Sequence, residues 1–142
     1  MSEQTVRRIC WCDYNIMIDR ILAQIKKDNR YRIEQVVALG RGGFVPGVHL
    51  SHHLGVPLVP LMWQTRDGAV NKRYITRVPS LIVDDINDTG RTLREVTTEC
   101  SWNGSCSTAV LINKKSSSFA AVDFSGESTD SPAWISFPWE KL

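Results

Sequence analysis

Two short runs of apolar residues, each ending in a polar or glycine-rich turn, constrain the fold of this chain more than any other feature. Residues 36–39 read Val-Val-Ala-Leu and residues 80–83 read Ser-Leu-Ile-Val, without the alternating polar positions of a half-exposed strand. Such runs are typical of strands that are buried on both faces of a parallel sheet. The sequence therefore predicts a sheet that is covered by helices on both sides.

Helical patterns separate the apolar runs and complete the fold prediction. Helices are expected around residues 17–25, at residues 44–54 and from residue 93 onward, and strands at residues 33–39, 57–61, 80–83, 108–112 and 120–124. Asp13 is the expected N-cap of the first helix, and Gly55 marks the expected end of the second. This alternation predicts an α/β fold with a doubly wound, mainly parallel sheet flanked by helices. With 142 residues, the chain suits one such domain.

Composition and charge exclude several classes of protein. Hydrophobic residues make up 42% of the chain and charged residues 23%, which is the composition of a folded globular domain. The formal net charge of +2 is too small for the uniformly basic face that binding to nucleic acid demands. No stretch approaches the roughly 18 apolar residues of a membrane-spanning helix, and the first ten residues lack the apolar region of a signal peptide. We expect a soluble, cytoplasmic protein with no nucleic-acid or membrane partner.

The cysteines, the histidines and one basic segment carry no clear site. Cysteine spacing fits neither a zinc knuckle nor a redox pair, so we expect reduced thiols at Cys10, Cys12, Cys100 and Cys106. His49, His52 and His53 have a spacing that could contact a metal, but no acidic partner or distant histidine supports this, and we interpret them as a surface helix face. Residues 63–78 are polar and basic, and we expect a surface loop and candidate lid there.

Two turns follow the two most strongly buried strands of the predicted sheet. Residues 40–43 are Gly-Arg-Gly-Gly, and residues 84–92 are Asp-Asp-Ile-Asn-Asp-Thr-Gly-Arg-Thr. Ligands of doubly wound sheets bind beyond the carboxyl ends of the strands. We therefore expect both turns to face one site.

The acidic turn combines carboxylates with the start of a helix. Backbone N–H groups of residues 88–91, with the hydroxyls of Thr89 and Thr92, would hold a phosphate at the positive end of that helix. Gly90 would let the backbone approach the phosphate closely. A solvated acidic turn would explain the charges but not the Thr-Gly-Arg-Thr that follows them.

The carboxylates of the same turn have their own chemistry. Asp84 and Asp85 would accept hydrogen bonds from the two hydroxyls of a ribose, or bind Mg²⁺ directly or through water, because a hard cation prefers oxygen ligands. Asp88 is placed for proton transfer. The turn therefore indicates a site for a sugar phosphate.

Residues 81–93, Leu-Ile-Val-Asp-Asp-Ile-Asn-Asp-Thr-Gly-Arg-Thr-Leu, resemble the 5-phosphoribosyl-1-diphosphate (PRPP) motif of the type I phosphoribosyltransferases. Two more segments, in the family's order, resemble its xanthine-guanine branch. Residues 38–47, Ala-Leu-Gly-Arg-Gly-Gly-Phe-Val-Pro-Gly, resemble the pyrophosphate loop, and residues 134–140, Trp-Ile-Ser-Phe-Pro-Trp-Glu, resemble the C-terminal segment. The resemblance implies transfer of the 5-phosphoribosyl group from PRPP to a 6-oxopurine (xanthine, guanine or hypoxanthine), with release of diphosphate and Mg²⁺ as cofactor.

The resemblance also implies a role for individual residues. Asp88 would be the catalytic base, and the ribose 5-phosphate part of PRPP would be bound by Asp84, Asp85, Asp88, Thr89, Gly90, Arg91 and Thr92. The departing diphosphate would be held by Gly40, Arg41, Gly42 and Gly43. The purine would be bound by Lys114, which would donate to its O6, by Trp134, which would stack on it, and by Ile135. The metal ligands would be Asp84, Asp85 and Glu140.

Three further expectations come from the resemblance alone. Residues 113–142 would contribute a hood over the base within the single domain at residues 1–142. The bond between Gly40 and Arg41 would be a non-proline cis peptide, and the chain would form a homodimer or homotetramer. Lys115 follows Lys114 directly, so the assignment of the O6 donor could shift by one residue.

Two other functions remain open on this sequence. A regulatory protein of the same fold would bind PRPP or a nucleotide as a signal without catalysing transfer. A phosphoribosyltransferase for another base would keep the PRPP motif, but the proposed role of Lys114 as donor to a purine O6 would not apply. The small net charge, together with the presence of Asp88 and Trp134, favours the purine enzyme.

Overall fold

The computed structural model describes residues 5–63, 78–100 and 106–140. The elements in chain order are β1 (Val6–Arg8), α1 (Trp11–Lys27), β2 (Gln35–Gly40), α2 (Phe44–Leu54), β3 (Leu58–Met62), β4 (Ser80–Asn87), α3 (Arg91–Cys100), β5 (Cys106–Lys114), β6 (Phe124–Thr129) and β7 (Trp134–Ser136). The expected lid falls almost wholly on residues 64–77, which lie outside the described residues.

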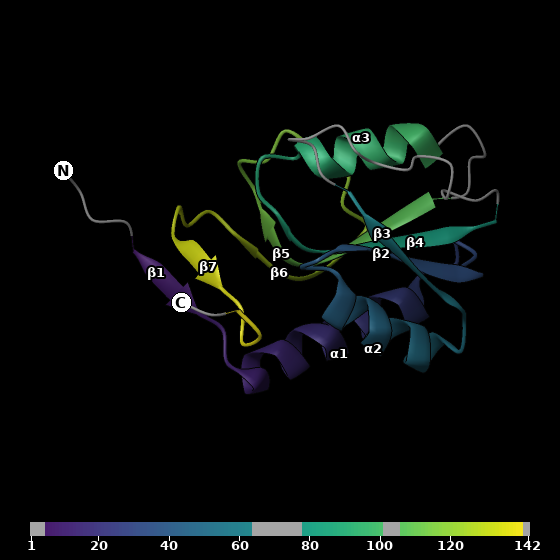
Figure 1. The fold of residues 1–142 in the computed structure, drawn as a ribbon, viewed down its shortest axis with the longest axis horizontal. Helices are drawn as coiled ribbons and strands as arrows, with labels where there is room; N and C mark the ends of the chain where they lie inside the picture. The colour runs from purple at the N-terminus through teal and green to yellow at the C-terminus, as the bar shows by residue number, and fades with distance from the viewer. Residues whose placement is uncertain (1–4, 64–77, 101–105, 141–142) are drawn as a thin grey trace.

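The main sheet has the strand order β3-β2-β4-β5-β6, and every neighbouring pair is parallel. Helices α1 and α2 cover one face of this sheet, and α3 covers the other (Figure 1). This is the predicted doubly wound α/β fold. Among the described residues, no helix combines the length and apolar character needed to cross a bilayer.

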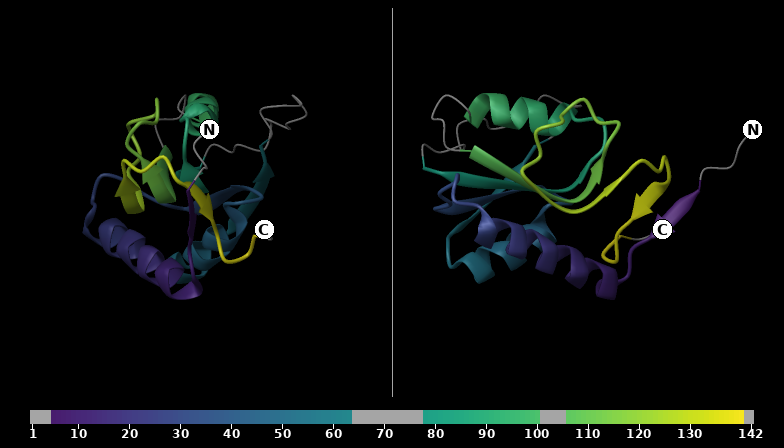
Figure 2. Two further views of the ribbon diagram at one scale, coloured as in Figure 1. Left: turned by 90° about the vertical axis from the view of Figure 1, so that its left-hand side faces the viewer. Right: turned by 180° about the vertical axis from the view of Figure 1, so that it is seen from behind.

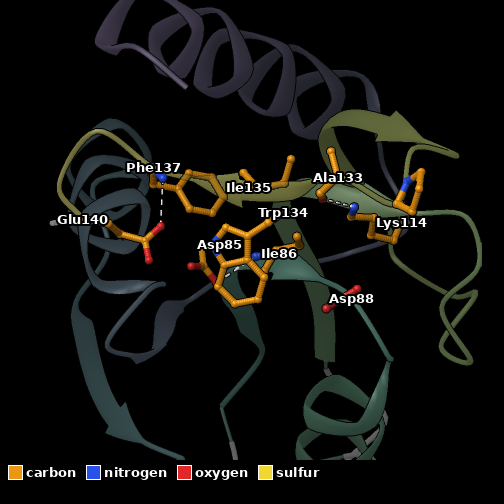
Figure 3. A pocket seen from close by; sticks show the side chains of 10 residues that line it. Asp85, Ile86, Asp88, Lys114, Ala133, Trp134, Ile135, Phe137 and Glu140 are labelled. Carbon is orange, nitrogen blue, oxygen red and sulfur yellow. Dashed lines mark hydrogen bonds between the residues drawn. The ribbon is translucent and has the colours of Figure 1, made fainter. Parts of the chain in front are cut away.

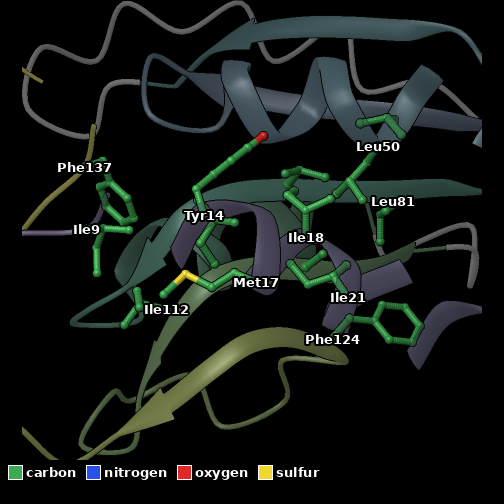
Figure 4. Close-up of a cluster of buried hydrophobic side chains, with 14 of the residues drawn as sticks. Ile9, Tyr14, Met17, Ile18, Ile21, Leu50, Leu81, Ile112, Phe124 and Phe137 are labelled. Atoms are coloured by element: carbon green, nitrogen blue, oxygen red, sulfur yellow. The ribbon is translucent and has the colours of Figure 1, made fainter. Parts of the chain in front are cut away.

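The apolar runs exist because each strand contributes to two hydrophobic cores. Along β4, Leu81 and Val83 pack with α1 and α2, whereas Ile82 faces the core beneath α3. Figure 4 shows the first core, in which Leu81 lies among side chains from both helices. Since successive side chains of a strand point to opposite faces, a strand between two helical layers must be apolar at every position.

A separate pair of strands forms a hood to one side of the main sheet. β1 pairs in parallel with β7, with Val6 opposite Trp134 and Arg8 opposite Ser136 (Figures 1 and 2). The sequence did not indicate either strand, because each has three residues and gains its partner from the opposite end of the chain. Of the expected hood at residues 113–142, only β7 belongs to this pair, and that these residues cover a base stays a prediction.

One ion pair joins this hood to the main sheet. The Arg7 guanidinium donates two hydrogen bonds to the Glu127 carboxylate on β6, one of them at 3.0 Å. This bond and the charge of Arg7 hold the pKa of Glu127 below its usual range. The ion pair links β1 to β6, and the buried Ile9 and Ile135 add apolar contacts between the pair of strands and the core.

Several boundaries differ from the sequence prediction, and the most important is the end of β4. This strand continues past the expected residue 83 to Asn87, so Asp84 and Asp85 lie within the strand and not in a turn after it.

Two other differences concern helix α1 and strand β6. Helix α1 begins at Trp11 with Cys10 as N-cap, because Asp13 accepts a hydrogen bond from the Cys10 N–H while the Asp13 N–H donates to Cys10 Sγ. Asp13 is thus inside the helix, as the partner in a capping box. The prediction of a strand at residues 120–124 was wrong, because β6 runs from Phe124 to Thr129 and overlaps that range only at Phe124. Directly before β6, the Asp123 carboxylate accepts the Thr108 N–H at 2.9 Å.

Candidate functional site

The glycine-rich turn after β2 lies in direct contact with the acidic turn, residues 84–92, whose first four residues are the end of β4. β2 and β4 are neighbours in register, with Ala38 opposite Val83, so their carboxyl ends open at the same edge. Gly42 lies so close to the Asp85 carboxylate that a Cβ on Gly42 would overlap it. The two turns therefore face one site, as the sequence predicts.

Three adjoining hollows in the described part of the chain share Asp85. The first is a cavity of about 240 Å³ lined by Asp85, Ile86, Asp88, Lys114, Pro132, Ala133, Trp134, Ile135, Phe137 and Glu140 (Figure 3). The second is lined by Arg41, Gly42, Asp85, Trp139 and Glu140. The third follows the acidic turn and is lined by Asp84, Asp85, Ile86, Asn87, Asp88, Thr89, Gly90, Thr92 and Leu93. A ligand with three parts could occupy all three hollows around one carboxylate.

Asp84 and Asp85 form a half-buried pair of acids at the centre of these hollows. The Asp85 N–H donates to Asp84 Oδ1 at 2.9 Å, and the Ile86 N–H donates to Asp85 Oδ1 at 2.8 Å. Burial, followed by the charge of Asp85, raises the pKa of Asp84 well above its usual range. Burial also raises the pKa of Asp85, and the charge of Glu140 adds to this. Proximity to a cation or to hydroxyl donors would lower both values.

Among the described residues, no salt bridge balances the charge of these two carboxylates. In the same part of the chain, no three His, Cys, Asp or Glu side chains gather around one point. The donor set suits Mg²⁺, which usually takes one or two carboxylates and completes its shell with waters and substrate oxygens. It does not form a complete cage of protein ligands.

Lys114 lies at the end of β5, where its buried ammonium group reaches the cavity wall. Its Nζ donates to the carbonyl of Ser131 at 2.7 Å and to that of Ala133 at 2.8 Å. Figure 3 shows the second of these bonds. These two bonds occupy two of its three protons and fix the direction of the third. Lys115, by contrast, is exposed and lies 3.8 Å from Asp130. Of the two lysines, it is Lys114 that lines the cavity.

The hood supplies the remaining wall of the cavity. Trp134 is 54% exposed although it lines the cavity, so its ring offers a free face to a planar ligand. Ile135 is buried and anchors the strand in the core. Glu140 is exposed and lines both of the first two hollows, with its Oε1 accepting the Phe137 N–H at 2.8 Å.

Three of the residues predicted to bind the phosphate line the third hollow, and Arg91 does not. Thr89, Gly90 and Thr92 line the third hollow, and Gly90 has a φ of 91°, in the region that favours glycine. Arg91 follows the same turn, but its side chain pairs with Glu95 along α3 at 3.1 Å. The guanidinium of Arg91 therefore belongs to the helix surface in this structure.

Only part of the glycine-rich turn is accessible to a ligand. The Gly40–Arg41 peptide is cis, as the resemblance implies. Arg41 is exposed, and together with Gly42 it lines the second hollow. Gly43 is buried, and its N–H donates to the Leu39 carbonyl at 2.8 Å, so this amide serves the turn itself. Arg41 and Gly42 are thus the part of the turn that a ligand can reach.

Several cavity residues were not predicted from the sequence. Ile86, Pro132, Ala133 and Phe137 line the first hollow. Ile86 lies within the motif, but an apolar residue between acids carries no signal of ligand contact. The others were hidden because their position depends on the pairing of β7 with β1, which no local pattern indicates.

Comparisons with known proteins place this geometry in a family. The phosphoribosyl transferase domain family matches residues 13–140. A purine phosphoribosyltransferase from Pyrococcus horikoshii is 28% identical, with 96% of this chain and 95% of that chain covered and a TM-score of 0.76. No curated protein matches the chain significantly in sequence.

Two further solved structures share the fold at lower identity. A xanthine-guanine-hypoxanthine phosphoribosyltransferase from Helicobacter pylori is 19% identical, with 96% of this chain and 93% of that chain covered and a TM-score of 0.73. An orotate phosphoribosyltransferase from Aeropyrum pernix is 17% identical, with 85% and 74% covered and a TM-score of 0.62. Because proteins named for different bases share this fold, the fold alone does not select a base.

A pair of glycine substitutions tests how tightly the acidic turn is packed. Gly90→Ala would place a Cβ against the Phe119 amide and 2.6 Å from Ser117 Oγ, whereas Gly55, also at positive φ, faces open space. Gly55→Ala should lower the free energy of unfolding by about 1–2 kcal/mol, the cost of a left-handed backbone. Gly90→Ala should lose about 1–3 kcal/mol more, because it also overpacks the turn. Urea unfolding measures both; equal losses would contradict the packing described.

Proposed function

Because the chain belongs to the phosphoribosyl transferase family, we propose that it transfers the 5-phosphoribosyl group of PRPP to a 6-oxopurine and releases diphosphate. The observation that carries the proposal is that Asp85 is shared by three hollows. PRPP and a base have three parts to be bound around one ribose: the base, the diphosphate and the 5-phosphate. The number and arrangement of the hollows suit these parts.

Each hollow has the chemistry of one part. The second hollow offers the Arg41 guanidinium, a strong donor to diphosphate oxygens. The third hollow ends at the first turn of α3, where Thr89 and Gly90 would receive the 5-phosphate. The first hollow has an apolar wall and the exposed Trp134 ring, which would stack on the base.

In the proposed reaction, the bond between ribose C1 and the diphosphate oxygen breaks, and a bond forms between C1 and purine N9. The electron pair of the broken bond leaves with the diphosphate, and Arg41 would stabilise the charge that develops there. Asp84 and Asp85 would accept hydrogen bonds from the ribose hydroxyls and so hold C1 in line with N9. Asp88, which lines both the first and the third hollow, would take the proton from N7 of the purine.

Mg²⁺ is the proposed cofactor. Asp85 and Asp84 would hold the ion, with Glu140 beside the second hollow as a further carboxylate. Once bound, the ion would neutralise diphosphate charge and improve it as a leaving group. The raised pKa values of both aspartates fit this role. Burial disfavours their charged forms, and a bound divalent cation would stabilise those forms again.

Lys114 is the reason for proposing a 6-oxopurine. A fixed ammonium donor at the cavity wall matches the O6 acceptor of xanthine, guanine or hypoxanthine. Adenine carries an amino group at the same position, so two donors would face each other and one would lose its partner.

An assay with six bases tests the proposal. PRPP and Mg²⁺ are supplied with xanthine, guanine, hypoxanthine, adenine, uracil or orotate, and base consumption is followed by absorbance. Turnover is expected only with one or more of the first three. Lys114→Met should raise KM for the base by about 10- to 100-fold, the loss of a charged hydrogen bond, and leave KM for PRPP unchanged. The exposed neighbour provides the matched control, Lys115→Met.

The other outcomes of that assay identify the competing functions. Turnover with adenine, uracil or orotate alone would show an enzyme for another base. Binding of PRPP without turnover of any base would show a regulatory protein. A rise in KM for PRPP in Lys114→Met would show that Lys114 does not face the base.

A second variant tests the proposed base catalyst. Asp88→Asn keeps the shape of the side chain but cannot accept a proton, so kcat should fall about 10²- to 10⁴-fold while PRPP still binds. The matched control is Asp19→Asn, which changes an exposed acid on α1. Single-turnover rates and calorimetric titration with PRPP measure the two effects separately. Unchanged turnover in Asp88→Asn would remove Asp88 from this role.

A further inference from the structure

A serine-rich segment between β5 and β6 packs against the back of the acidic turn. This serine segment, residues 116–119, reads Ser-Ser-Ser-Phe and begins in a turn in which the Ser117 N–H donates to the Lys114 carbonyl at 3.0 Å. The segment contacts the turn through Asn87, which is 2% exposed and ends β4. Asn87 borders the third hollow, but neither Asn87 nor the serine segment is assigned a role in the reaction proposed above.

The Asn87 side chain joins three parts of the chain. Its Nδ2 donates to Asn113 Oδ1 and to the Phe119 carbonyl, both at 2.9 Å, and its Oδ1 accepts the Ser117 hydroxyl at 2.9 Å. The Ser117 hydroxyl oxygen also accepts the Phe119 N–H at 3.1 Å. Both donor protons of the amide are therefore used, and the side chain has a single orientation.

A second set of bonds reaches the phosphate-binding turn itself. The Ser118 N–H and the Ser118 hydroxyl both donate to the Thr89 carbonyl, at 2.9 Å and 2.7 Å. The Ser118 hydroxyl oxygen in turn accepts a hydrogen bond from Arg94 of α3. The carbonyl of Thr89 is thus held from behind while its side chain lines the third hollow.

The fit at Gly90 shows how close this contact is. A Cβ on Gly90 would overlap the Phe119 amide and would lie 2.6 Å from Ser117 Oγ and 2.8 Å from Ser118 Oγ. The segment therefore fills the space behind the turn. Any rotation of the peptide at Gly90 would have to displace the segment or break its bonds.

We propose that Asn87, Ser117 and Ser118 are positioning residues that hold the amides after Asp88 in the orientation that binds the 5-phosphate. The inference rests on the proposed function for the identity of the ligand, but the rigidity that it assigns to the turn does not. An amide binds an anion well only when it is already oriented, because a free loop must lose conformational entropy on binding. The hydrogen bonds of these three side chains go to other protein groups, so the proposal does not require them to contact the phosphate themselves.

Hydrogen exchange on the ligand-free protein tests the rigidity. Asn87→Leu, Ser117→Ala and Ser118→Ala each remove part of the network, and Ser116→Ala is the matched control because Ser116 is exposed in the same segment. Exchange at residues 88–92 should speed up at least about tenfold in the first three, as expected for lost hydrogen bonds, and stay unchanged in the control. Exchange in the hood strand β7 should not change. Unaltered exchange at residues 88–92 in Asn87→Leu and Ser117→Ala would overturn the proposal.

Ligand binding then tests the link to the 5-phosphate. Calorimetry compares guanosine 5′-monophosphate with guanosine, since the ratio of their Kd values isolates the phosphate. The Kd for guanosine divided by the Kd for guanosine 5′-monophosphate should fall by about tenfold in Ser117→Ala, the effect of one lost hydrogen bond. The Kd for guanosine itself should not change. Ser117→Thr, which keeps the hydroxyl, should restore the ratio. A merely structural defect would lower both affinities together, and that result would overturn the positioning role.

The two proposals fail in different ways. If the unaltered protein binds the nucleotide no better than the nucleoside, the proposed function fails, and the exchange data still decide whether the network holds the turn rigid. If the unaltered protein prefers the nucleotide and Ser117→Ala keeps the full preference, the proposed function stands and the positioning role is overturned. Should Asn87→Leu fail to fold, the serine variants carry both tests.

Discussion

The close approach of Gly42 to the Asp85 carboxylate is the constraint on which the rest of the site depends. It brings the backbone of the glycine-rich turn against a carboxylate that forms no salt bridge among the described residues. The approach is possible because β2 and β4 are adjacent parallel strands and because position 42 has no side chain. The half-buried Asp85 lies beside the glycine-rich turn and near the start of α3. Together these groups form a compact site for a phosphorylated sugar that binds with a metal cation.

Much of the fold could be predicted from the sequence, because a sheet covered on both faces imposes a strong local pattern. Val37 and Ile82 face one core, whereas Val36 and Leu81 face the other, so both strands had to be apolar throughout. The contact between the two turns was predictable for the same reason. Parallel order alone brings the carboxyl ends of neighbouring strands to one edge, whatever the side chains in the turns.

Features that depend on distant pairing could not be predicted. The hood exists because β1 pairs with β7, and three residues at each end carry no local signal of that contact. The last strand of the main sheet was predicted at residues 120–124 but lies at Phe124–Thr129, and the side-chain contact of Asp123 with the distant Thr108 N–H carries no local signal. Asn87 was visible as a polar residue in the motif, but its partners are 26 to 32 positions away in the chain.

Asp85 is the centre of the proposed PRPP site, and Gly42 is the residue that allows this arrangement. Titration of the protein with PRPP in the presence of Mg²⁺, compared with the same titration of Gly42→Ala, tests this claim most directly. The account predicts one PRPP bound per chain, and a loss of affinity of at least about tenfold in a Gly42→Ala variant that melts as a folded protein, since the new Cβ must separate the turns. Equal PRPP affinity in the two proteins, or no PRPP binding by the unaltered chain, would contradict it.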